Sequence, residues 1–165
     1  MGRGTGPAFG HARARPRSNA VPPLRLAAIA SMASGLTTAA LIFLPDLYAP
    51  VADGLAGRMQ RVIDPAYAWR AWIALLHPLL AFTAAAGLAA LYRERWPVLA
   101  SLGLVAFGVW AFVEVAQQAL TLFAFDPWRR AWLAGDETVR ATIALRTAIY
   151  DGLWDAAYNL LLLLR

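Results

Sequence analysis

The sequence contains no cysteine and no lysine, and it has only two histidines. Without cysteine, disulfide frameworks, thiolate metal sites and cysteine nucleophiles are all excluded. Charged residues make up only 15% of the 165 residues, whereas an average soluble domain has about 25%, and 60% of the residues are hydrophobic. So few charges cannot cover the surface of an ordinary water-soluble domain. The composition therefore indicates a membrane protein.

Sequence motifs of several common enzyme classes are missing as well. The chain has no H-E-x-x-H, G-x-S-x-G or G-x-G-x-x-G sequence and no glycine-rich phosphate loop. One histidine, His11, lies in the N-terminal arm, which excludes a multi-histidine metal or haem site within one chain. A carboxylate-rich site with one histidine would still suit a divalent ion. The sequence carries no cofactor signature, and we expect no cofactor.

Four long apolar segments predict an all-α fold, an integral membrane four-helix bundle. About 20 residues are needed to cross a hydrocarbon core, and each segment approaches or exceeds that length. The segments are residues 24–44, 71–92, 97–125 and 141–164. The fourth is unusual because charged residues interrupt it, whereas the second has no formal charge.

Residues 1–23 predict a flexible basic arm in front of one transmembrane domain over residues 24–165. The arm is rich in arginine, glycine and proline and shows no helical or strand periodicity. A cleaved signal peptide is the competing interpretation, since a basic region precedes an apolar one. The apolar run is longer than the usual 7–15 residues or so of a signal peptide, and no clear A-x-A cleavage site follows it. Retention as a membrane anchor is therefore favoured.

The connections between the segments differ in length. Only residues 93–96 separate the second and third segments, which predicts an antiparallel helical hairpin. The two longer connections, residues 45–70 and 126–140, contain short apolar patterns and helix start signals. We expect each of them to hold a short helix that lies at the membrane interface.

The arginines indicate an orientation rather than a nucleic-acid partner. On one side of the predicted membrane lie eight of them, against seven on the other, and the basic cluster next to the first segment favours a cytoplasmic N-terminus. With an even number of spans, the C-terminus is then cytoplasmic too. The sequence predicts a protein of the bacterial inner membrane, with tryptophan and tyrosine residues at both interfaces. The eight arginines are Arg3, Arg13, Arg15, Arg17, Arg25, Arg93, Arg95 and Arg165.

The fourth segment cannot face lipid on all sides. An aspartate near the bilayer centre costs about 2.5–3.5 kcal/mol, while each leucine contributes only about 0.3–0.6 kcal/mol in return. Asp151, Asp155 and Asn159 follow one another at intervals of four residues and so share one stripe of a helix. We expect this stripe to face the interior of the bundle, where partners or water can reach it.

Two other segments carry polar residues at a matching depth. Glu114, Gln117 and Gln118 share one face of the third segment, and His77 lies in the second. A rise of about 1.5 Å per residue places His77, Glu114 and Asp151 in the same half of the membrane. The candidate ligand-binding or proton-binding site consists of His77, Glu114, Gln117, Gln118, Asp151, Asp155 and Asn159.

This arrangement predicts a transporter-like or accessory membrane protein with a polar pocket. The pocket would bind a proton, a cation or a small amphiphile. Apart from the lipid bilayer, a second copy or a partner membrane protein would help, because four helices are few for a solute pathway. One alternative is a membrane enzyme that acts on a lipid-type substrate by carboxylate acid–base chemistry. The other is a structural protein whose polar residues only assemble helices.

Overall fold

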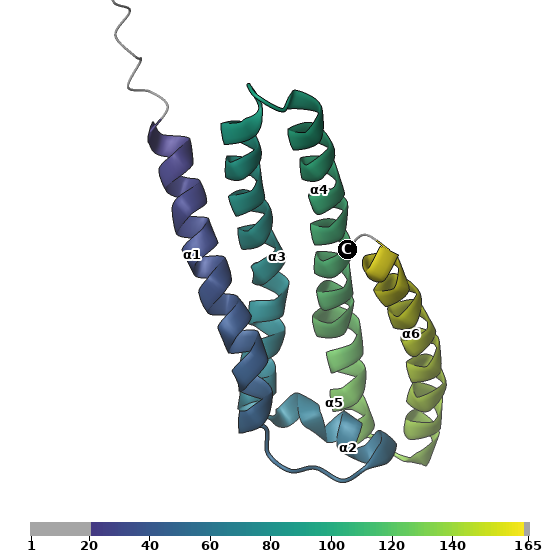
Figure 1. Cartoon of the computed structure of the whole chain (residues 1–165). Coiled ribbons are helices and arrows are strands. Elements are labelled where there is room, and N and C mark those ends of the chain that lie inside the picture. Colours follow the sequence, from purple (N-terminus) through teal and green to yellow (C-terminus); the bar gives the residue numbers. More distant parts are fainter. Residues whose placement is uncertain (1–20, 164–165) are drawn as a thin grey trace, which may run out of the picture.

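The computed structural model describes residues 21–163, and every regular element in that range is a helix (Figure 1). The all-α prediction is therefore confirmed for this part of the chain. In chain order the elements are α1 (Val21–Phe43), the 3₁₀ turn η2 (Leu44–Leu47), α2 (Gly54–Gln60), the 3₁₀ turn η3 (Arg61–Ile63), α3 (Pro65–Tyr92), α4 (Pro97–Leu120), the π-helical turn η4 (Thr121–Phe125), α5 (Asp126–Ala134) and α6 (Glu137–Leu163). The predicted basic arm lies largely outside the described residues.

The four long helices form a row in the order α1, α3, α4 and α6 (Figure 1). The helix α3 packs closely against α1 on one side and α4 on the other, whereas α6 contacts α4 and α5 more sparsely. The two short helices, α2 and α5, lie together at one end of the row. The predicted integral membrane four-helix bundle is therefore not confirmed.

Three helical stretches are long and apolar enough to cross a membrane: Leu24–Leu47, Pro65–Tyr92 and Pro97–Ala134. Large apolar side chains are exposed along them; Leu36 and Phe112, for example, are 73% and 74% exposed. Apolar exposure on this scale suits lipid and not water. The helix α6 is not among the three stretches, because arginine and aspartate interrupt its apolar run. The structure thus supports a helical protein with three candidate membrane spans.

The helix α3 begins at Pro65, earlier than the predicted residue 71, because Asp64 caps it. One carboxylate oxygen of Asp64 accepts hydrogen bonds from the backbone N–H groups of Ala66, at 2.8 Å, and Tyr67, at 3.2 Å. The other accepts from the N–H of Ala49, at 2.7 Å. These bonds, first of all that from Ala49, lower the pKa of Asp64 below its ordinary value because they stabilise the carboxylate.

The helix α4 does not end at the predicted residue 125 but continues through a π-helical turn into α5. Pro127 has no N–H and its ring crowds the carbonyl four residues earlier, which a regular α-helix cannot accommodate without distortion. The turn η4 ends two residues before this proline, and Thr121 and Phe125 are buried in it. Such turns are frequent at functional sites. Here, the turn brings α5 back toward α2 and α6.

The close approach of α1 and α3 depends on a glycine. A Cβ atom at Gly87 would collide with the Cβ atom of Ala27 on α1, whereas a Cβ atom at Gly103 on α4 would meet nothing within 4 Å. Small residues that let two backbones approach are typical of packing between helices in membranes. The α1–α3 contact therefore rests on shape rather than on charge.

The large buried side chains gather at the end of the molecule where α2 and α5 lie. Met59 from α2, Phe125 from η4, and Ile143 and Tyr150 from α6 form one cluster. The rings of Phe125 and Tyr150 are stacked, with their centroids 4.2 Å apart. Both predicted connections thus contain a short helix, and these helices complete a core. Their position at a membrane interface stays a prediction.

Candidate functional site

A cavity of about 400 Å³ lies between α3, α4 and α6, close to α2 and α5. We call it the polar cavity. Its walls combine arginine, carboxylate, amide and hydroxyl groups with aromatic rings. The residues that line it include Arg58, Tyr67, Arg70, Ala71, Glu114, Gln117, Gln118, Thr121, Phe125, Arg129, Tyr150, Trp154, Tyr158 and Leu162.

Three arginines line the polar cavity: Arg58, Arg70 and Arg129. Arg129, on α5, is the most buried of them, with only 6% of its surface exposed. Its Nη1 donates a hydrogen bond of 3.2 Å to Asp126, which also accepts one of 3.2 Å from the hydroxyl of Tyr67. The guanidinium also lies over the ring of Phe125, 4.3 Å from its centroid, and over that of Tyr67, at 4.9 Å. These contacts join α5 to α3 and hold the Arg129 side chain in place.

Arg58 on α2 is more exposed and pairs with Asp151 on α6. Its Nη1 donates a hydrogen bond of 2.9 Å to one oxygen of Asp151, and its Nη2 donates to the other. The hydrogen bond to Asp151 is the main cause that raises the pKa of Arg58. This ion pair fastens α6 to the short helix α2 beside the polar cavity.

The guanidinium groups of Arg70 and Arg129 each have a donor atom that makes no hydrogen bond to a described residue. Nε of Arg129 and Nε of Arg70 are buried, yet neither has a hydrogen-bond partner among the described residues. Arg70 also forms no ion pair with any residue of that part of the chain. Buried donors without a partner are rare, because each costs free energy. Both belong to side chains that line the polar cavity.

The other polar groups follow the inner face of α4. Gln117 donates a hydrogen bond of 3.2 Å to the backbone carbonyl of Trp154 on α6, and Thr121 lies 2.7 Å from the hydroxyl of Tyr150. Gln118 donates to Glu114, at 3.3 Å, within the same helix. The first two contacts tie α4 to α6, while Glu114 and Gln118 face the polar cavity without a bond to another helix among the described residues.

The predicted site residues separate into two groups. Glu114, Gln117 and Gln118 line the polar cavity, as their shared helix face led us to expect. His77 instead contacts α1, where its Nδ1 lies 2.8 Å from the hydroxyl oxygen of Thr37. Asp151 pairs with Arg58, as described above. His77, Glu114 and Asp151 thus have three different partners and do not form one buried pocket.

The stripe predicted on α6 is only partly turned inward. Thr147 is buried and Asp151 half-buried, but Asp155 and Asn159 are exposed. The helix α6 contacts α5 and α4 only sparsely, and the residues that it sends into the core, Ile143 and Tyr150, lie in its first half and at its middle. Within the described residues, no three His, Asp or Glu side chains gather as a metal site would require.

Sequence reasoning missed the three arginines of the polar cavity. Their positions next to apolar segments are typical of charges at a membrane interface, and no periodic signal joins Arg58, Arg70 and Arg129. A usable signal was available for Arg129, because the residues around it in α5 include two tryptophans, Trp128 and Trp132. Its partner Asp126 lies three residues away on the same helix.

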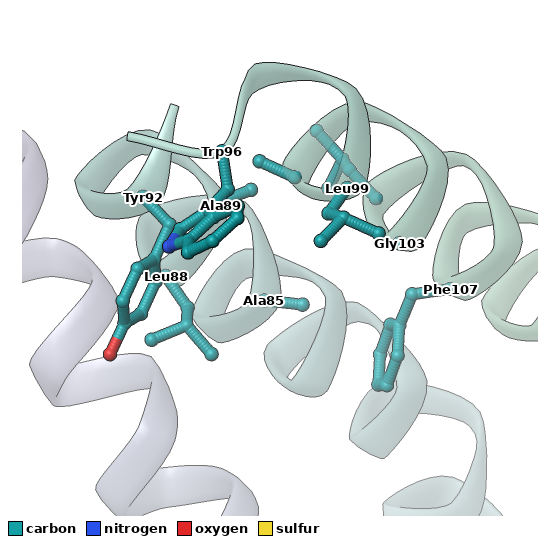
Figure 2. Close-up of a pocket in the computed structure, with 10 residues that line it drawn as sticks. Ala85, Leu88, Ala89, Tyr92, Trp96, Leu99, Gly103 and Phe107 are labelled. Carbon is teal, nitrogen blue, oxygen red and sulfur yellow. The ribbon is translucent and has the colours of Figure 1, made fainter. Parts of the chain in front are cut away.

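A second hollow, of about 490 Å³, lies between α3 and α4 near their connecting loop (Figure 2). Small residues such as Ala85, Ala89 and Gly103 leave the space. Figure 2 shows the rings of Tyr92 and Trp96 near one end and that of Phe107 near the other. All of its lining residues are apolar or aromatic, so it offers shape but no charged group.

No protein-family model matches the sequence, and neither the curated proteins nor the solved structures include one significantly similar to it. The geometry of the polar cavity is therefore the starting point for a function.

Proposed function

We propose that this chain is a small membrane protein that binds a small amphiphile in the polar cavity, as a transporter-like or accessory subunit. The observation that carries the proposal is the cavity itself, about 400 Å³ between three long helices. A volume of this order suits a small organic molecule. Polar groups at one end and apolar groups such as Leu162 and Trp154 elsewhere on the wall would suit the two parts of an amphiphile.

A bare cation is a poorer match for this cavity than an amphiphile. Three arginines line the cavity, and among the described residues that line it Glu114 is the only carboxylate. Asp126 and Asp151, which could otherwise attract a cation, already pair with Arg129 and Arg58. Arg70, which forms no ion pair among the described residues, therefore opposes the entry of a cation by electrostatic repulsion.

The proposal includes the placement of α6 in the membrane beside α4. Its outward residues Leu145, Ile149 and Leu153 are 58–69% exposed, as on the three candidate spans. Asp151 and Asp155 lie on the opposite side of the helix from these residues, and Asp151 has a partner on α2. Membrane insertion would cover the leucines with lipid. We keep the expectation of a cytoplasmic N-terminus in a bacterial inner membrane as part of the proposal.

A binding measurement tests the proposal, with a variant in which a larger side chain fills the cavity as the comparison. Full-length protein in phosphatidylcholine nanodiscs would be titrated with pyrene-labelled decyl amphiphiles, and energy transfer from tryptophan would report binding above that of empty nanodiscs. Gln118→Trp should abolish the signal, because the larger side chain occupies the cavity. Leu120→Trp, which points outward two residues along the same helix, should retain it.

Two outcomes would contradict the proposal. One is an absence of specific binding by every labelled amphiphile to a folded wild-type protein. The other is equal binding by Gln118→Trp and the wild type. In the first case a purely structural role for the polar residues becomes the better account.

A further inference from the structure

We infer that the polar group of the ligand is an anion, a carboxylate or a phosphate, held by Arg70 and Arg129. This inference rests on the proposed function and names the ligand class of the same cavity. The decisive observation is that Nε of each guanidinium is buried and has no hydrogen-bond partner among the described residues. Both side chains line the polar cavity, so a ligand inside it can reach them.

Arg129 supplies the preorganised part of this anion site. Its side chain is only 8% exposed, and Asp126 and two aromatic rings hold it, so little conformational entropy remains to be lost on binding. Asp126 occupies Nη1, which leaves the Nε side of the guanidinium for another acceptor. Guanidinium groups recognise carboxylate and phosphate through paired donors of this kind.

Arg70 supplies the charge. In the described part of the chain, Arg58 and Arg129 each form an ion pair, whereas Arg70 has none. An anion near Arg70 would therefore meet a positive charge that no carboxylate of the described chain compensates. Glu114 lines the same cavity, but it lies about three helical turns before Phe125, which belongs to η4, and so away from the arginine end. The cavity thus offers its positive end to an anionic group.

The chemistry excludes a covalent role for this pair. Arginine stays protonated and neither donates a proton at neutral pH nor acts as a nucleophile. Arg70 and Arg129 can hold and orient an anion, and Tyr67 and Thr121 can add hydroxyl donors beside it. The inference is therefore one of recognition, with no bond made or broken.

A comparison of headgroups tests it. Three pyrene-labelled decyl amphiphiles, with a carboxylate, a phosphate and a trimethylammonium headgroup, would be titrated into the same nanodiscs. The two anions should bind, and the trimethylammonium compound should bind at least about tenfold more weakly, which is the effect expected of one charged hydrogen bond. Inorganic phosphate and acetate should compete only weakly, because they lack the chain; if they bind as tightly as the amphiphiles, the site recognises the free ion.

Matched variants localise the effect. Arg70→Gln should weaken anion binding about tenfold or more, because it removes the positive charge that attracts the anion. The variant loses no ion pair to another described residue. Arg129→Lys keeps the charge next to Asp126 but removes Nε, and should also weaken binding. Arg130→Gln, an exposed neighbour on α5, is the control and should leave binding unchanged. Circular dichroism would show that each variant is folded.

The outcomes separate the inference from the proposed function. If the trimethylammonium compound binds as tightly as the anions, or if Arg130→Gln weakens binding as much as Arg70→Gln, the anion site is wrong while amphiphile binding stands. If none of the compounds binds the wild type, the proposed function itself is wrong.

Discussion

The two ends of this molecule are stabilised by different means. Near the loop that joins α3 and α4, the helices meet through small apolar residues, and the hollow there has no charged lining. At the opposite end, α2 and α5 bring arginine and aspartate side chains into a core of aromatic rings. Close packing of small residues stabilises the first end, whereas ion pairs and contacts with aromatic rings stabilise the second. The donor groups that remain unused occur at the second end, which is where we expect a ligand.

Removal of the Arg129 guanidinium should have the largest effect. Arg129→Ala leaves Asp126 buried without its cation, which costs about 3–5 kcal/mol for a buried pair. Unfolding of the purified protein in mixed detergent micelles would measure the loss. Arg130→Ala, the exposed neighbour, should change the free energy of unfolding by less than about 0.5 kcal/mol. Similar losses in both variants would contradict the distinction between the two ends.

A methyl group at the α1–α3 contact should have the next largest effect. Gly87→Ala places a Cβ atom against Ala27, and overpacking of this kind costs about 1–3 kcal/mol. Gly103→Ala on α4 meets no neighbour and should be neutral or stabilise the protein by up to about 1 kcal/mol. The same detergent unfolding assay applies. A Gly87→Ala protein as stable as the wild type would show that the helices do not pack this closely.

The cap of α3 should make stability depend on acid pH. The folded protein lowers the pKa of Asp64 below its ordinary value of 3.8, so this stabilisation is fully present above that pH. The stabilisation is lost as the pH falls through the lowered pKa of Asp64 in the folded protein, where the carboxylate becomes protonated. Asp64→Ala should lower the melting temperature by several degrees at pH 7, and the difference should shrink below pH 3.8. A difference that stays constant down to about pH 2 would rule out the carboxylate as its source.

The smallest effect is expected for the ion pair between α2 and α6. Both side chains are more than a third exposed, so Asp151→Asn should cost less than about 1 kcal/mol. Local opening should increase nonetheless, because the pair fastens the sparsely packed α6. Hydrogen exchange of the α6 backbone would measure it, with Asp155→Asn, an exposed residue on the same helix, as the control. Faster exchange in the Asp155→Asn variant alone would contradict this account.

The helices were predictable from the sequence because the signals that form them are local. Apolar length predicted four spans, and three of them are candidate membrane spans in the structure, while α6 is not. The short connection over residues 93–96 fits the loop between α3 and α4. The shared face of Glu114, Gln117 and Gln118 also follows from helical spacing alone. These residues line one cavity in the structure.

The partners of the polar side chains were not predictable in the same way. Counting residues along a helix gives the depth of a side chain in the membrane. It gives neither the rotation of the helix about its axis nor the residues that a connecting loop brings against it. His77 is turned toward Thr37 on α1, and Asp151 meets an arginine from a connection that was expected only to cover the membrane surface. The π-helical turn that redirects α5 has no simple signal except the proline after it.

Access of water to the polar cavity tests the central claim most directly. The chain has no cysteine, so a single cysteine can be labelled without background. In membrane-embedded protein, Gln118→Cys should react with a small hydrophilic thiol reagent, and a bound anionic amphiphile should slow the reaction. Leu120→Cys, two residues along the same helix and facing lipid, should stay unreactive. A Gln118→Cys variant that does not react, or equal labelling of the two variants, would contradict a polar cavity between α3, α4 and α6.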